Sequence, residues 1–172
     1  IALGGGAIGC LFYLFVVMMG LGFGTGAQIF IGRRNGEKNY KNISEVYYHS
    51  FYFLMTLAIL LFVFMYFFTP IFLRTFVKND AIYNTSMEFM KYRKYSVFLA
   101  FINVSLSSFF VGTIRTKVLT YSTIFNTLTN IVLDYVLIFG NWGFPRMTVG
   151  GAAIASTVAE AATTIYFLVF FY

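Results

Sequence analysis

Five apolar segments constrain the fold of this chain more than any other feature. They run over residues 8–31, 49–68, 95–113, 118–139 and 149–172, and each is near the roughly 20 residues that a membrane-spanning helix requires. Of all residues, 59% are hydrophobic and 10% are charged, whereas soluble domains have about 45–50% apolar and about 25% charged residues. The sequence therefore predicts an all-α, polytopic membrane protein in contact with the lipid bilayer.

The charged residues lie almost entirely in the segments between these apolar runs. Twelve basic residues oppose six acidic ones, giving a net charge of +6. Because no basic stripe follows one helix face, this excess suits lipid headgroups and argues against nucleic acid as a partner. The basic residues divide evenly between alternate connections, but the short loops 33–42 and 115–117 are the more densely charged, which favours a cytoplasmic position for them.

The segment 118–139 carries polar residues that a simple membrane span does not need. Asn126, Asn130 and Asp134 are spaced i, i+4, i+8 and so share one stripe of a helix. Asp134 lies roughly 9 Å inside the helix end, where a carboxylate costs on the order of 2.5–3.5 kcal/mol. This cost predicts a functional site at Asp134, although a structural hydrogen bond to a neighbouring helix would also retain the residue.

The last segment adds polar side chains to a stretch that opens with small residues, GGAAIASTVAE. The small residues predict close antiparallel packing on the helix 118–139, which would bring Ser156 and Thr157 to Asn130 and Asp134. Carboxylate, amide and hydroxyl oxygens suit a hard cation such as Na⁺, and the carboxylate alone suits a proton. Glu160 is a second acid at membrane depth and, with Asn126, is expected to line the cavity or support the site.

Two further patterns concern packing and chain reversal. Gly20/Gly24 and Gly22/Gly26 form overlapping GxxxG pairs, which predict close approach of a neighbouring helix. The second segment is expected to stop before Pro70, and 69–94 reads as a mixed connection. Asn103 and nearby serines predict hydrogen bonds between helices.

Three stretches carry a family resemblance: GTGAQIFIGRRNGEKN, RTKVLTYSTIFNTLTNIVLDYVLIFG and GFPRMTVGGAAIASTVAE. They resemble the multidrug and toxic compound extrusion (MATE) transporters, and the likeness covers essentially the whole chain. It implies that residues 1–172 are helices two to six of a twelve-helix, two-lobe transporter, a partial N-terminal lobe. The first helix and the C-terminal lobe would then belong to the same polypeptide outside this sequence.

The resemblance also implies a function. Such a protein would be a multi-pass antiporter of the cytoplasmic membrane, exchanging Na⁺ or H⁺ for amphipathic organic cations, and would need no cofactor. Asp134 and Asn130 match the family's N-lobe cation site, and Ser156 or Thr157 would supply a hydroxyl. A lipid-linked oligosaccharide flippase of related fold remains an alternative. A membrane-embedded enzyme is a more distant one, since the chain lacks DDxxD and HExxH patterns.

Overall fold

The computed structural model describes residues 2–171, and the part of the chain that it describes is helical without strands. Its elements are α1 (Ala2–Gly36), α2 (Tyr40–Phe76), α3 (Asp80–Arg93), α4 (Ser96–Gly112), α5 (Thr116–Phe139), the short 3₁₀ turn η1 (Asn141–Gly143) and α6 (Thr148–Phe171). Four of these helices are each long and apolar enough to cross a membrane, and α3 with α4, bent by 55°, passes the same test as a pair. The prediction of an all-α, polytopic membrane protein is confirmed.

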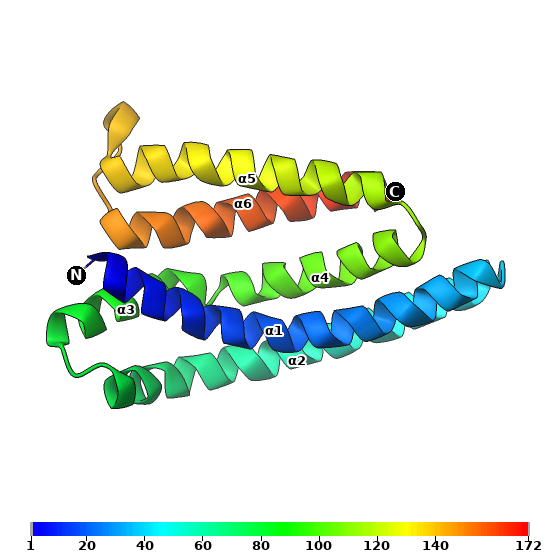
Figure 1. Ribbon diagram of the computed structural model, residues 1–172, viewed down its shortest axis with the longest axis horizontal. Coiled ribbons are helices and arrows are strands. Elements are labelled where there is room, and N and C mark those ends of the chain that lie inside the picture. The colour runs from blue at the N-terminus through cyan, green and yellow to red at the C-terminus, as the bar shows by residue number, and fades with distance from the viewer. Residues whose placement is uncertain (1, 172) are drawn as a thin grey trace.

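The helices form a bundle in which α6 lies between α5 and the other elements (Figure 1). α1 packs on α2, α3 and α4, while α5 packs chiefly on α6. The buried centre of the first group is apolar, with Val16, Leu54 and Phe101 among its members. Many large apolar side chains on the outer faces are exposed, as expected for surfaces that meet lipid.

α5 and α6 form the antiparallel pair that the small residues predict. A Cβ atom added to Gly151 would lie 2.8 Å from the backbone oxygen of Leu137, so the two backbones approach as closely as glycine permits. Ala155 is fully buried against Val136 and Leu137, and Ala152 is half-buried. The close helix approach is therefore confirmed.

The four glycines of the overlapping GxxxG pairs in α1 divide into two sets. A Cβ added to Gly20 or Gly24 would collide with Phe101 or Val104 of α4, whereas Gly22 has open space around it. The hydroxyl of Ser108 in α4 also donates to the carbonyl oxygen of Gly24, at 2.8 Å. The Gly20/Gly24 pair thus makes the predicted close contact; a Cβ at Gly22 or Gly26 would meet nothing within 4 Å.

The first connection is shorter than the predicted loop 33–42, because helix α1 continues to Gly36 and α2 begins at Tyr40. Glu37 lies between Arg33 and Arg34 and accepts hydrogen bonds from both, at 3.1 and 2.8 Å. The hydrogen bonds from Arg34 and then Arg33 lower the pKa of the exposed Glu37 carboxyl. This local pairing satisfies charges at the helix end that the sequence pattern assigns to a loop.

The expectation that the second helix stops before Pro70 is wrong. α2 continues through Pro70 to Phe76. Met65, Thr69 and Leu73 are all buried, so one packed stripe runs through the proline. Packing against neighbouring helices lets a membrane helix tolerate the loss of the backbone N–H that proline lacks.

The mixed connection 69–94 is also corrected, since most of it is the 14-residue helix α3. Asn79 caps the start of α3 by accepting from the backbone N–H groups of Ala81 and Ile82. At the bend into α4, the Ser96 hydroxyl donates to the carbonyl oxygen of Arg93, at 2.9 Å. The polar signals in 69–94 therefore mark the ends of a helix rather than a long loop.

Candidate functional site

The polar stripe of α5 faces α6. The amide nitrogen of Asn126 donates to the Thr163 hydroxyl at 2.8 Å and to the Ala159 carbonyl at 3.3 Å. Asn126 thus holds the two helices together, about one turn from Asn130. The structure places it next to the candidate site and gives it a structural partner.

Asn130 connects Asp134 of its own helix with Ser156 of α6. With the amide oriented to satisfy its neighbours, its nitrogen donates to Asp134 Oδ2 at 3.0 Å. Its oxygen then accepts from the Ser156 hydroxyl at 3.1 Å and from the Ser156 backbone N–H at 3.3 Å. Three of the residues singled out in the sequence, Asn130, Asp134 and Ser156, therefore meet at the α5–α6 contact.

Asp134 has no compensating positive charge. None of the ion pairs formed within residues 2–171 includes it. Its Oδ1 atom is buried and has no hydrogen-bond partner among the described residues, while Oδ2 faces Asn130. A buried carboxylate oxygen with no donor normally requires an explanation such as a bound ion, a proton or a water molecule.

Thr157 is placed differently from Ser156. Its hydroxyl donates to the carbonyl oxygen of Ala153, at 2.8 Å, within its own helix. Such an i−4 bond is the usual way in which a threonine satisfies itself in a helix. Of the two neighbouring hydroxyls, the structure brings Ser156 to Asn130.

Glu160 belongs to a separate polar cluster, formed with Arg93, Tyr13 and Ser96. Arg93 Nη2 lies 2.6 Å from Glu160 Oε1, and the Tyr13 hydroxyl lies 3.4 Å from Oε2. Ser96 donates to the Tyr13 hydroxyl at 2.8 Å, and the Arg93 guanidinium lies 4.1 Å from the centroid of the Tyr13 ring. The cluster joins α1, α3, α4 and α6.

Arg93 is the site residue that sequence reasoning missed. It lies in KYRK, which resembles a basic loop at the membrane surface. The signal that could have found it is the helical spacing of Ser86, Phe89 and Met90 earlier in α3, all of which are buried. That spacing carries α3 into the bundle and brings Arg93 with it.

Asn103 joins α4 to α6 beside this cluster. Its amide nitrogen donates to the backbone oxygen of Glu160 at 3.1 Å, and its oxygen accepts from the Thr164 hydroxyl at 2.9 Å. The prediction that Asn103 forms interhelical hydrogen bonds is confirmed. α6 is therefore polar on two sides, one facing α5 and one facing α3 and α4.

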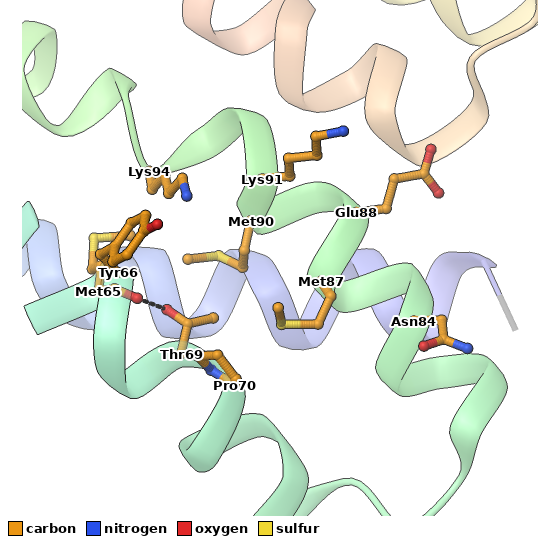
Figure 2. Close-up of a pocket in the computed structure, with 10 residues that line it drawn as sticks. All are labelled: Met65, Tyr66, Thr69, Pro70, Asn84, Met87, Glu88, Met90, Lys91 and Lys94. Atoms are coloured by element: carbon orange, nitrogen blue, oxygen red, sulfur yellow. Dashed lines mark hydrogen bonds between the residues drawn. The ribbon is translucent and has the colours of Figure 1, made fainter.

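A groove of about 390 Å³ lies elsewhere, between α2 and α3 near Pro70 (Figure 2). Met65, Met87 and Met90 contribute to its lining, and Lys94 Nζ lies 4.5 Å from the centroid of the Tyr66 ring. The carboxylate of Glu88 points toward the first turn of α6. The residues that line this groove include none of those predicted to bind the cation.

Comparison with known proteins gives a family match and relatives with similar names. The MatE family model matches residues 1–136. The chain is 29% identical over 166 residues to "Probable multidrug resistance protein YoeA" of Bacillus subtilis, covering 95% of this chain and 36% of that protein. It is 27% identical over 157 residues to "Probable multidrug resistance protein NorM" of Listeria monocytogenes, covering 91% and 34%. The chain thus spans about a third of the length of these relatives.

Solved structures share the fold. An inward-facing multidrug resistance MATE family transporter of the MOP superfamily aligns with a TM-score of 0.87 at 20% identity, covering 97% of this chain and 38% of that one. A MATE structure in the bent conformation aligns with a TM-score of 0.82, also at 20% identity, covering 98% and 40%. The arrangement of α1–α6 recurs in these proteins, and with the family-model match it shows that the chain belongs to the MatE family.

Proposed function

We propose that this chain forms part of a multidrug efflux antiporter, and that Asp134 binds the cation whose gradient drives export. The observation that carries the proposal is the state of Asp134. Its carboxylate lies in a helix that is long and apolar enough to cross a membrane, and among the described residues it has no basic partner and one of its oxygens is buried without a donor. Retaining such a group is costly, and the cost is offset when a Na⁺ ion or a proton binds.

The neighbouring groups fit either cation. Asp134 provides one negative charge, while Asn130 and Ser156 provide neutral oxygens, the hard ligands that suit Na⁺. The Asn130 amide lies close enough to donate to Asp134 Oδ2 in one orientation. In the opposite orientation it would present its oxygen beside the carboxylate, as binding of Na⁺ requires. Rotation of this amide would thus switch between a ligand-free and a cation-bound arrangement.

The site lies between two helices that have different neighbours. α5 packs chiefly on α6, and α6 is tied on its other side to α3 and α4. A cation that neutralises Asp134 removes the cost of burying it and so favours conformations in which the site is closed to water. Release of the cation on the other side of the membrane would favour the open state and the binding of a cationic substrate.

The whole transporter requires more than this chain. Alternating access involves two bundles that move about a shared site, and the chain covers about a third of its relatives. We therefore expect the isolated 172 residues to insert without exporting drugs. The names of the relatives favour multidrug substrates over lipid-linked oligosaccharides.

The test uses the full-length protein in proteoliposomes made from lipids of bacterial cytoplasmic membranes. Efflux of ethidium, a cationic amphipathic dye, is measured under a Na⁺ gradient at equal pH and under a pH gradient without Na⁺. We expect one gradient to drive efflux in the wild type and to fail with Asp134→Asn. Gradient-driven efflux at the wild-type rate in the Asp134→Asn protein would refute the role of Asp134.

A further inference from the structure

The α5–α6 pair contains two acidic residues, Asp134 and Glu160, and they differ in their charged partners. Asp134 forms no ion pair within the described residues, whereas Glu160 pairs with Arg93 at 2.6 Å. The Arg93 and Glu160 side chains are only 12% and 18% exposed. Their charges therefore cancel in a place where water screens them weakly.

Arg93 is held in this position from three other helices. Its guanidinium pairs with Glu160 of α6 and lies over the ring of Tyr13 in α1, and Ser96 of α4 donates to the Tyr13 hydroxyl and to the Arg93 carbonyl oxygen. Its Nη1 atom is buried with no acceptor among the described residues. Within the described chain, Glu160 is thus the acid that neutralises Arg93.

The two acids are close enough to influence each other. Asn130 faces Ser156, and the helices run antiparallel, so Asp134 lies near the level of residue 152. Eight residues of α6 then separate that level from Glu160, which is roughly 12 Å along the axis. At this distance and an effective dielectric constant of about 20, one unit charge changes the affinity of a monovalent cation by about tenfold.

One other acid lies near α6. Glu88 of α3 approaches Gly150, but its side chain is exposed. Solvent and salt screen an exposed charge far more than a buried one. Removing Glu88 therefore provides a matched control for removing Glu160.

We propose that Arg93 is a specificity-determining residue of the α5–α6 cation site. By neutralising Glu160, it leaves Asp134 as the uncompensated acid of the described α5–α6 pair, and so sets the affinity of the site for a Na⁺ ion or a proton. This inference rests on the proposed function of Asp134. It assigns to a residue of α3 the control of charge at a site built by α5 and α6.

The test measures the concentration of coupling cation that gives half-maximal ethidium efflux from proteoliposomes containing the full-length protein, with Na⁺ at fixed pH or H⁺ without Na⁺. Glu160→Gln keeps a hydrogen-bond acceptor for Arg93 but leaves its positive charge uncompensated. We expect the half-maximal concentration to rise about tenfold. In the double variant Arg93→Gln/Glu160→Gln it should return to within about twofold of the wild type. Glu88→Gln should change it less than twofold, because that charge is screened.

A purely structural role for the ion pair gives a different pattern. The folded fraction of Glu160→Gln would then keep the wild-type cation dependence, and the double variant would lose as much thermal stability as the single variants, or more. That pattern would overturn the inference. It would leave the proposed function standing if Asp134→Asn still abolishes coupled efflux, whereas normal coupled efflux in Asp134→Asn would overturn both.

Discussion

The two acids of the α5–α6 pair show how two packed helices hold carboxylates in different environments. Where α5 meets α6, Asp134 faces the neutral amide of Asn130, and one of its oxygens is buried without a donor among the described residues. On the side toward α3 and α4, the Glu160 carboxylate accepts from Arg93 and Tyr13, and the Glu160 backbone oxygen accepts from Asn103. The first environment leaves an interaction for an ion to make, and the second is already satisfied.

This difference separates function from stability. A buried ion pair contributes little over an apolar replacement, but breaking it by removing one partner costs about 3–5 kcal/mol. A lone carboxylate contributes nothing to stability and costs desolvation energy. We therefore expect substitutions at the two acids to have opposite consequences for folding.

The largest expected effect comes from removing the charge of Asp134. In the full-length transporter, Asp134→Asn should abolish or severely reduce cation-coupled efflux while thermal stability in detergent stays equal or rises, because the substitution removes a costly charge at nearly constant volume. Efflux assays paired with a melting curve on the same preparation check both parts. If only Asp134→Leu reduced efflux, and did so together with poor folding, Asp134 would be structural.

Breaking the Arg93–Glu160 ion pair should instead reduce stability. Arg93→Met leaves the Glu160 carboxylate buried without its partner, and we expect a loss of about 3–5 kcal/mol in the free energy of unfolding. Arg93→Lys, which keeps the charge but loses the planar guanidinium over Tyr13, should lose less. Melting curves compare the two; an Arg93→Met protein as stable as the wild type would show that the pair is weak.

A smaller effect is expected at Asn130. Asn130→Ala removes a neutral ligand and leaves the charge of Asp134, so coupled efflux should persist with a higher half-maximal cation concentration, by a factor of about 10 if one hydrogen-bonding ligand to a charged group is lost. Cation titrations of efflux measure this shift. Complete loss of coupling would mean that Asn130 does more than provide a neutral oxygen.

The smallest effects test the packing that holds the two helices in register. Gly151→Ala places a Cβ where the Leu137 backbone oxygen lies 2.8 Å away, so α5 and α6 must move apart at a cost of about 1–3 kcal/mol. The matched control is Gly22→Ala, which meets nothing within 4 Å and should be neutral or stabilising by up to about 1 kcal/mol. Equal melting temperatures for the two variants would contradict the close approach at Gly151.

The sequence predicts the fold and the α5–α6 contact well because both depend on local patterns. Apolar length identifies the spans, and the i, i+4, i+8 spacing places Asn126, Asn130 and Asp134 on the face that meets α6. Small residues at Gly151 and Ala155 identify the contact surface.

What the sequence does not predict depends on contacts between distant segments. Arg93 lies 67 positions from Glu160 in the chain, and no local pattern pairs them. The helix through Pro70 and the helix α3 are missed for the same reason, since buried contacts with other helices override the local signals of proline and charge. Likewise, the position of α4 determines which glycines of the two GxxxG pairs in α1 make a close contact.

The break between α3 and α4 also constrains how the chain enters the membrane during synthesis. With 14 and 17 residues, these helices are about 21 and 26 Å long, and each is shorter than the roughly 30 Å hydrocarbon core. They must therefore partition as one unit, although α3 is much the more polar of the two. If α3 were left at the surface, α4 alone would be at the lower limit of length for a spanning helix. Failure of α4 to cross would invert the orientation of the α5–α6 hairpin. We therefore expect the apolar contacts that bury Phe89 and Met90 to favour the membrane topology on which α5 and α6 depend.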